Sequence, residues 1–297
     1  MGKASSVSVV LYTALALLAF AANSILSRIA LHDGAIDAAS FSTIRLIAGA
    51  VTLVLVSAAS PRTALPVKGS WISAAMLFLY AVPFSFAYTL LSVATGALIL
   101  FGCVQITMMG AAWRSGERPP ALQWIGLSLA FGGLVYLVLP GLEAPSPAGA
   151  ALMALAGFAW GVYSLRGRGA TNPLAQTTSN FVRSIPFALV ISLVWLPRFS
   201  AQRHGVLLAV ASGAVASGLG YVVWYRALRG LTAVRAAVVQ LFVPILAGVG
   251  GVIFLAEEIS ARLVLATILV LGGIALALYA RDIKKLLRRS FQSLQGT

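Results

Sequence analysis

Charged residues are scarce in this chain, and acidic residues are the scarcest. Only 9% of its 297 residues are charged, and seven acids stand against 21 lysines and arginines, a formal net charge of +14. A soluble domain carries roughly 25% charged residues, whereas this chain is 60% hydrophobic, with a mean hydropathy of +0.96. The composition therefore indicates an integral membrane protein. The basic residues lie in short connections between apolar stretches, where they orient a chain in the lipid bilayer, so we expect no nucleic-acid partner.

The sequence lacks the residues that several kinds of chemistry require. A single cysteine, Cys103, excludes an internal disulfide, and the isolated His32 and His204 have no cysteine or histidine at metal-ligand spacing. The chain has no G-x-x-x-x-G-K-[ST], which excludes ATP-driven pumping by this chain. No nucleophile–base constellation is visible. We therefore expect no metal site, no cofactor and no enzymatic activity.

Ten apolar stretches are long enough to cross a bilayer, which takes about 20 residues. The boundary between the third and the fourth is the least distinct, because only Ser92 to Gly96 interrupt them, but the segment from Trp71 to Trp113 is too long for one crossing. The sequence thus predicts an all-α integral membrane protein of ten transmembrane helices. The predicted spans are 9–30, 39–59, 71–92, 94–113, 121–139, 147–166, 175–196, 205–227, 232–255 and 261–280.

The basic residues also predict the orientation. With the N-terminus in the cytoplasm, the inner segments carry 15 lysines and arginines and the outer segments carry four. Cytoplasmic connections are the ones enriched in basic residues. We therefore expect both termini in the cytoplasm, with residues 281–297 as a basic cytoplasmic tail.

The first half of the chain recurs in the second at a nearly constant interval, which predicts two five-helix repeats, residues 1–140 and 141–280. Because five is odd, the second repeat enters the membrane from the opposite face. Inverted repeats of this kind are typical of transporters, with the substrate path between the halves. The recurring features are Phe20-Ala21 and Phe158-Ala159, Arg45 and Arg183, Glu117 and Glu258, and Gly132-Gly133 and Gly272-Gly273.

On these features the chain resembles the drug/metabolite transporter superfamily, of the EamA type. The resemblance covers residues 9–280 and rests on the paired units, on Ile44-Arg45-Leu46 and Val182-Arg183-Ser184, and on Gly116-Glu117-Arg118 and Glu257-Glu258-Ile259. Within the superfamily the pattern is similar to that of bacterial aromatic amino-acid exporters. The resemblance implies an inner-membrane carrier that exports aromatic and other neutral amino acids by alternating access. One departure is that Pro244 in the ninth span has no proline counterpart near Cys103 in the fourth.

No predicted span contains a carboxylate. The seven acids lie in connections or at span ends: Asp33, Asp37, Glu117, Glu143, Glu257, Glu258 and Asp282. Proton-coupled carriers use ionisable groups inside the membrane. We therefore expect facilitated transport without proton coupling, or coupling through the substrate itself.

Polar and aromatic side chains in mid-span are the candidate substrate-binding residues. Asn23, Gln105 and Gln240 carry amides that either bind substrate or bond across helices. The aromatic side chains either form the walls of a pocket for an amphipathic molecule or pack against helices and lipid. These are Tyr80, Phe84 and Tyr88, spaced for one helix face, with Trp160 and Tyr163 in the sixth span and Tyr221 and Trp224 in the eighth.

Two arginines and three prolines lie within spans. Arg45 and Arg183 either pair with a substrate carboxylate or lock a gate, or else they extend to water at the membrane surface, which the polar residues before each of them favour. Pro83, Pro186 and Pro244 are either hinges for alternating access or static bends. The glycine pairs favour close packing within a monomer over dimerisation.

Two other classes of carrier share this fold class. A nucleotide-sugar or sugar-phosphate transporter would need several cations in its cavity, and only Arg45 and Arg183 are available. A multidrug or organic-cation exporter would need an intramembrane carboxylate or a complete aromatic cage, and the carboxylate is absent.

Overall fold

In the part of the chain that the computed structural model describes, the secondary-structure elements are all helices. This part comprises residues 6–59, 69–114, 120–139, 141, 144–167, 170–228, 230–231, 236 and 239–295, without the side chains of Ser6 and 281–295. The first seven helices are α1 (Ser6–His32), α2 (Ala38–Ala58), α3 (Trp71–Tyr88), α4 (Val93–Arg114), α5 (Ala121–Val138), α6 (Pro147–Gly167) and α7 (Pro173–Trp195). They are followed by η2 (Leu196–Arg198), α8 (Arg203–Ala211), η3 (Ser212–Leu219), α9 (Gly220–Leu228), α11 (Phe242–Leu255) and α12 (Ala261–Gln295).

The described helices match the predicted spans closely. Nine of them are long and apolar enough to cross a membrane, counting α8, η3 and α9 as one continuous span, Arg203–Leu228. The indistinct boundary in the sequence is a real one, because α3 ends at Tyr88 and α4 begins at Val93. Among the described residues, the chain is therefore an all-α protein with nine membrane-length helices and one shorter apolar helix.

The shorter helix, α11, is the described second part of the ninth span predicted over 232–255, of which residues 232–235 and 237–238 lie outside the described residues. The α11 helix has 14 residues, Phe242–Leu255, and it begins directly after Leu241, a turn residue. Pro244 is the reason, since a proline has no N–H to bond the carbonyl of residue 240 and its ring clashes with that carbonyl. Pro244 therefore lies in the first turn of α11, directly after an interruption of the helix at Leu241.

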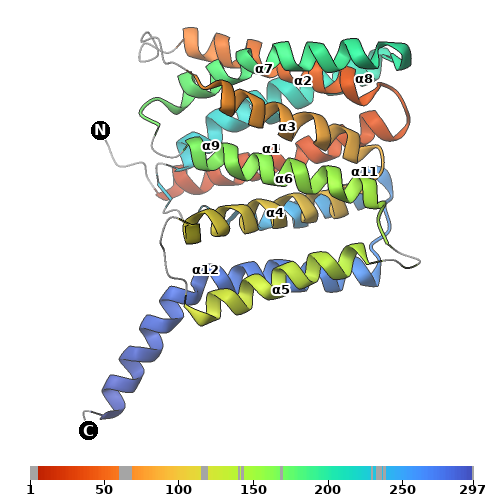
Figure 1. Ribbon diagram of the computed structural model, residues 1–297. Coiled ribbons are helices and arrows are strands. Elements are labelled where there is room, and N and C mark those ends of the chain that lie inside the picture. Colours follow the sequence, from red (N-terminus) through yellow and green to blue (C-terminus); the bar gives the residue numbers. More distant parts are fainter. Residues whose placement is uncertain are drawn as a thin grey trace.

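The helices form one bundle with two distinct ends (Figure 1). We call the end where α1 begins and α12 extends beyond the other helices the tail end. The opposite end is the acidic end, because the four carboxylates with described side chains lie in its connections: Asp33, Asp37, Glu257 and Glu258. The α5 and α12 helices pack together at one edge of the bundle and α2 packs with α7 at the other.

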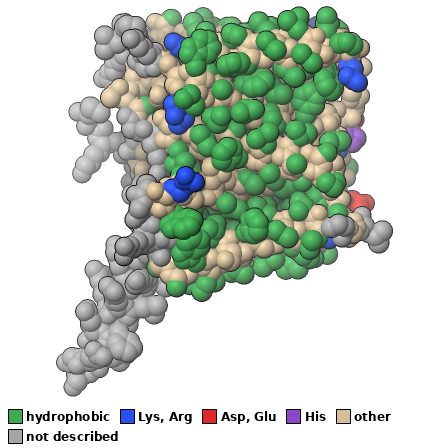
Figure 2. Space-filling model, viewed as in Figure 1, with side chains coloured by type: hydrophobic (Ala, Val, Ile, Leu, Met, Phe, Trp, Pro, Cys, Tyr) green, Lys and Arg blue, Asp and Glu red, His purple; other side chains and the backbone are tan. Residues whose placement is uncertain are grey.

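Apolar side chains cover the flank of the bundle between these ends. Figure 2 shows a broad hydrophobic face with charged side chains gathered toward its two ends. Leu193, Val194, Ile253 and Phe254 are each 66–68% exposed. A flank of this kind is stable against lipid tails and unstable against water. The chain is thus a multi-pass membrane protein.

The principal helix contacts join the two halves of the chain. The α2 helix packs on α7, α4 on α11 and α5 on α12, while α3 packs on α6 and α1 packs on α9. The interior of the bundle therefore lies between side chains of the first half and side chains of the second.

Candidate functional site

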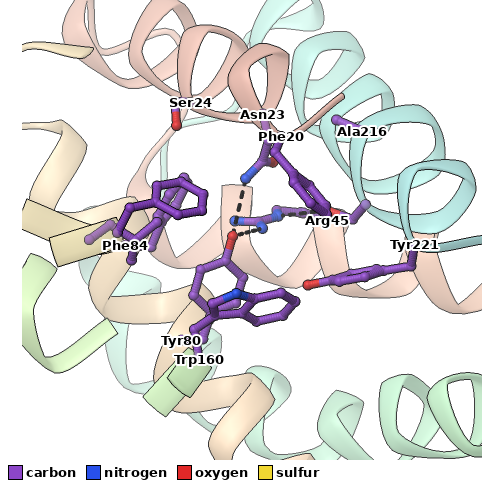
Figure 3. Close-up of a pocket in the computed structure, with 12 residues that line it drawn as sticks. Phe20, Asn23, Ser24, Arg45, Tyr80, Phe84, Trp160, Ala216 and Tyr221 are labelled. Atoms are coloured by element: carbon purple, nitrogen blue, oxygen red, sulfur yellow. Dashed lines mark hydrogen bonds between the residues drawn. The ribbon is translucent and has the colours of Figure 1, made fainter. Parts of the chain in front are cut away.

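A narrow pocket lies in the middle of the bundle, between the two halves (Figure 3). The free volume of the pocket is about 20 Å³, room for about one water molecule. An organic ligand would therefore have to displace the aromatic side chains. The lining residues are Phe20, Asn23, Ser24, Arg45, Tyr80, Phe84, Leu100, Phe101, Trp160, Ala216, Ser217 and Tyr221.

Arg45 projects from α2 into this pocket and does not extend to water, which corrects the interpretation favoured from its sequence context. The residue is 2% exposed. Its Nε donates to Ser217 Oγ at 3.2 Å and its Nη2 donates to Tyr80 Oη at 3.0 Å. The guanidinium carbon lies 5.1 Å from the Tyr80 ring centroid and 4.9 Å from that of Phe84. Its remaining nitrogen, Nη1, is buried without an acceptor.

A hydrogen-bonded network holds Tyr80 beside this arginine. Ser212 Oγ donates to Asn23 Oδ1 at 2.7 Å, and Asn23 Nδ2 donates to Tyr80 Oη at 3.3 Å. The Tyr80 oxygen therefore accepts from both Asn23 and Arg45, so its own proton is available for a further acceptor. The Tyr80 hydroxyl and Arg45 Nη1 are two donors at one place in the pocket. A carboxylate, with two oxygens, matches this pair.

The residues that the second half of the chain contributes to this network lie on the π-helix η3. Its wider turn brings Ser212 and Ser217, five residues apart, to the same side as Asn23 and Arg45. Gly213 makes the close contact possible, because a Cβ there would lie 2.2 Å from the Arg45 carbonyl oxygen. The run of small residues in this span thus has a packing function.

Aromatic rings form the apolar walls of the pocket. The ring centroids of Tyr80 and Trp160 are 4.9 Å apart, and those of Trp160 and Tyr221 are 5.2 Å apart. Phe84 lies 5.4 Å from Tyr80, and Phe20 lies 6.2 Å from Tyr221. A pocket with a few polar groups and broad aromatic faces suits a small amphipathic molecule.

A second space, which we call the vestibule, extends from these rings toward the tail end. It has a free volume of about 110 Å³ and reaches Gly167 and Leu228, the last residues of α6 and α9. Trp160 and Tyr221 line both the pocket and the vestibule, so their rings separate the two spaces. The other lining residues of the vestibule are Tyr163, Ser164, Trp224 and Tyr225.

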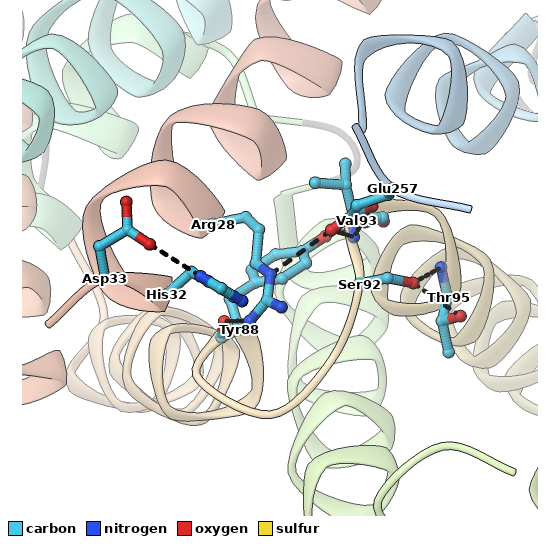
Figure 4. Close-up of polar contacts among 8 residues, drawn as sticks. All are labelled: Arg28, His32, Asp33, Tyr88, Ser92, Val93, Thr95 and Glu257. Atoms are coloured by element: carbon cyan, nitrogen blue, oxygen red, sulfur yellow. Dashed lines mark hydrogen bonds and ion pairs between the residues drawn. The ribbon is translucent and has the colours of Figure 1, made fainter. Parts of the chain in front are cut away.

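At the acidic end the helices are joined by polar contacts (Figure 4). Arg28 Nη1 donates to the Tyr88 carbonyl at 2.9 Å, and Arg28 Nε lies 3.4 Å from Glu257 Oε1. The two Glu257 oxygens accept from Val93 N, the first N–H of α4, at 3.0 and 2.8 Å. These contacts tie together α1, α3, α4 and the residues after α11.

Glu257, and not Glu258, is the structurally important glutamate here. Glu258 is exposed, whereas Glu257 lies 140 residues after Glu117, the same interval as between the glycine pairs. The chain turns at Ala256 with a φ of 52°, one residue before Glu257. Glu117 itself lies outside the described residues.

The ten predicted binding residues fall into four groups. Asn23, Tyr80, Phe84, Trp160 and Tyr221 line the pocket, and Tyr163 and Trp224 line the vestibule. Tyr88 is fully buried, with its ring against Phe84 at 4.7 Å, between the pocket and the acidic end. Gln105 and Gln240 line neither space: Gln105 is buried in α4, and Gln240 donates to the Ala236 carbonyl of its own segment.

Arg183 does not line the pocket. It is partly exposed, donates to Ser179 Oγ and lies 5.8 Å from the Trp71 ring centroid, near the tail end. Its surroundings match the interpretation that an arginine in a span extends to the membrane surface. Pro83 and Pro186 lie inside α3 and α7, which continue past them.

Sequence reasoning missed several pocket residues. Ser24 and Ser217 were not singled out, and Phe20 was noted only as part of the repeat. The signal for Ser212 and Ser217 was present in the two Ser-Gly pairs at 212–213 and 217–218, whose serines are polar residues within an apolar span. The remaining lining residues, Leu100, Phe101 and Ala216, carry no such signal.

An apolar ten-segment bundle with a polar and aromatic pocket between its halves has the architecture of a membrane carrier. The sequence profile of the EamA-like transporter family matches residues 147–279. An uncharacterized protein of Pseudomonas aeruginosa, PA1977, is 50% identical over 271 residues, which cover 91% of this chain and 94% of that protein. The chain belongs to the EamA-like transporter family.

Two further proteins are more distantly similar to the chain. An uncharacterized transporter of Archaeoglobus fulgidus is 25% identical over 226 residues, which cover 71% of this chain and 77% of that protein. One crystal structure superposes with a TM-score of 0.65 at 19% identity, over 92% of this chain and 98% of its own. The second similarity shows the fold alone.

Proposed function

We propose that this protein is a secondary transporter that exports aromatic and other neutral amino acids across the bacterial inner membrane. The observation that carries the proposal is the buried Arg45 guanidinium, whose Nη1 has no acceptor in a pocket walled by aromatic rings. A carboxylate would satisfy that donor, and the rings would pack against an apolar or aromatic side chain. Amino acids combine these two groups.

The helix pairings support an inverted repeat and alternating access. Suppose that each helix of the first half is exchanged with its counterpart in the second, so that α3 becomes α9 and α6 becomes α1. The contact between α3 and α6 then becomes the contact between α9 and α1. The same exchange leaves the pairs α2 with α7, α4 with α11 and α5 with α12 unchanged. Two-fold exchange of this kind is what a carrier with inverted repeats requires, with the substrate site between the repeats.

The charge distribution supports the orientation of the pathway. The tail end is cytoplasmic if basic connections lie inside. The vestibule then faces the cytoplasm, while the contacts of Arg28 and Glu257 hold the outer end closed. This is the arrangement expected of a carrier that waits for substrate from the cytoplasm.

The two rival substrate classes fit the pocket less well. Sugar phosphates and nucleotide sugars carry two or more negative charges, and Arg45 is the single cation among the lining residues. An organic cation would be repelled by Arg45, which already covers the faces of Tyr80 and Phe84. Proton coupling would need an ionisable acid in the membrane, and the sequence has none within a span.

The test is uptake into liposomes that contain only the purified protein. Radiolabelled phenylalanine, threonine and methionine are compared with a sugar phosphate and an organic cation, with protein-free liposomes as the control. We expect saturable amino-acid uptake without ATP and an initial rate that an imposed pH gradient changes little. Uptake of the sugar phosphate or the cation in place of amino acids would contradict the substrate class, and strong acceleration by a proton gradient would contradict the uncoupled mechanism.

A further inference from the structure

We infer that the pocket accepts a carboxylate without an accompanying ammonium group, so that aromatic monocarboxylates are substrates besides amino acids and leave the cell driven by the membrane potential. This inference rests on the proposed function, because it uses the same pocket and the same arginine. It extends that function by naming the charge of this further substrate class and the source of energy for its export.

The carboxylate half of a ligand finds two donors in the pocket. Arg45 Nη1 is buried without an acceptor, and the Tyr80 hydroxyl already accepts from Arg45 and Asn23, which leaves its proton to donate. A guanidinium at the middle of a membrane protein is unfavourable without an anion nearby. Binding one carboxylate neutralises the charge and satisfies both donors together.

The ammonium half of an amino acid finds no equivalent partner. None of the twelve lining residues is acidic, and no predicted span contains a carboxylate. Cation–π contact would be the alternative, but the Arg45 guanidinium already lies about 5 Å from the Tyr80 and Phe84 ring centroids. A second cation there would meet the first at short range, where like charges repel strongly in a low dielectric. A neutral hydroxyl in place of the ammonium group avoids this repulsion.

The charge of the substrate then sets the direction of transport. A monocarboxylate carries one negative charge across the membrane in each cycle, whereas a zwitterionic amino acid carries none. Moving one charge through 100 mV is equivalent to about 2.3 kcal/mol, or about fifty-fold in concentration. An interior-negative potential therefore expels the anion without any protonatable group in the carrier.

The experiment compares three labelled molecules that share a benzyl group in liposomes containing the purified full-length protein. They are L-phenylalanine, L-3-phenyllactate, in which a hydroxyl replaces the ammonium group, and phenethylamine, which has no carboxylate. A potassium gradient with valinomycin sets the membrane potential, and protein-free liposomes correct for passive leak. We expect phenyllactate to enter at least as fast as phenylalanine and phenethylamine not to enter above the leak.

The dependence of uptake on the membrane potential is a second, independent test of the charge of the transported molecule. Making the vesicle interior 100 mV negative should lower the final accumulation of phenyllactate by about fifty-fold and leave that of phenylalanine unchanged. Arg45→Gln and Arg45→Lys should both reduce phenyllactate uptake at least tenfold. Arg183→Gln is the matched control, since it removes the other arginine within a span, and it should retain uptake.

The outcomes separate this inference from the proposed function. Phenylalanine uptake with phenyllactate at less than a tenth of that rate would overturn the inference and leave the amino-acid exporter standing. Phenyllactate uptake that ignores the potential would also overturn it. Uptake of phenyllactate with little phenylalanine would support the inference for monocarboxylates and remove amino acids from the substrate list, and uptake of neither would overturn both.

Discussion

Arg45 and Arg183 occupy corresponding positions in the two halves, 138 residues apart, yet their environments differ. Arg45 is 2% exposed and bonded to Ser217 and Tyr80 in the pocket, whereas Arg183 is partly exposed beside Trp71 near the tail end. At the same interval of 138, Ser217 corresponds to Leu79 and Tyr80 corresponds to Gly218. An arginine stands in both halves at this interval, but the two hydroxyl groups that bond Arg45 have no counterparts at it.

The backbone differs between these two regions as well. Gly213 lets η3 approach the Arg45 carbonyl so closely that a Cβ would lie 2.2 Å from that oxygen. The residue 138 positions before Gly213 is Ala75, whose Cβ rules out an approach of the same kind. The comparison teaches that a repeat in sequence locates equivalent helices but does not locate equivalent chemistry.

The largest expected effect separates the two arginines directly. Arg45→Gln should lower the initial rate of substrate uptake about a hundredfold, because removing one partner of a desolvated charge contact removes several kcal/mol of binding. Arg183→Gln should change the rate less than about twofold, since contacts near a surface contribute about 0–1 kcal/mol. Uptake rates in liposomes, normalised to reconstituted protein, provide the measurement. Equal losses from both variants would show that the arginines act as a symmetric pair.

A substitution at the contact between α2 and η3 tests the same difference between the two regions. Gly213→Ala should destabilise the protein by about 1–3 kcal/mol, because the added methyl group meets backbone that has no room to move. Gly132→Ala is the matched control in α5, where an added Cβ meets nothing within 4 Å. Thermal unfolding in detergent, followed by size-exclusion chromatography, compares the two variants. An unchanged melting temperature for Gly213→Ala would mean that α2 and η3 are less closely packed than their geometry indicates.

The sequence predicted the helices better than it predicted the site. Apolar length alone located the spans, including the break between α3 and α4, because crossing a bilayer imposes a nearly fixed length. The direction in which a side chain points depends on its neighbours. From the sequence, the Arg45 side chain was therefore expected to extend to water. In the structure it points inward and bonds Ser217, which is 172 residues away. The π-helical turn that presents Ser217 also has no local sequence signature.

A smaller effect is expected from the hydroxyl that connects the pocket network. Tyr80→Phe keeps the ring against Trp160 and removes the oxygen that accepts from both Arg45 and Asn23. We expect about a tenfold loss of uptake, in line with about 1.5–3 kcal/mol for a hydrogen bond to a charged group. Tyr163→Phe is the control, because that ring lines the vestibule and not the pocket. A larger loss from Tyr163→Phe would place substrate selection in the vestibule.

The acidic end offers a further comparison, between adjacent glutamates. Glu257→Gln removes the negative charge that faces Arg28 and that accepts the hydrogen bond from Val93 N. We therefore expect a lower melting temperature and a loss of uptake of about threefold to tenfold. Glu258→Gln should change neither, because the Glu258 side chain is exposed. Identical behaviour of the two variants would show that this end is held closed by other contacts.

The smallest expected effect concerns Gln240, which the sequence placed among the binding residues. Its amide donates at 3.1 Å to the Ala236 carbonyl, four residues earlier, and its side chain lines neither the pocket nor the vestibule. Gln240→Leu removes one local hydrogen bond of about 0.5–1.5 kcal/mol, so uptake should stay within about twofold of the unmodified protein. Asn23→Leu is the contrasting variant, because Asn23 joins Ser212 to Tyr80 inside the pocket. If Gln240→Leu abolished uptake while the protein stayed folded, the ninth segment would have to move toward the pocket during transport, and its break before Pro244 would become the first candidate for the hinge.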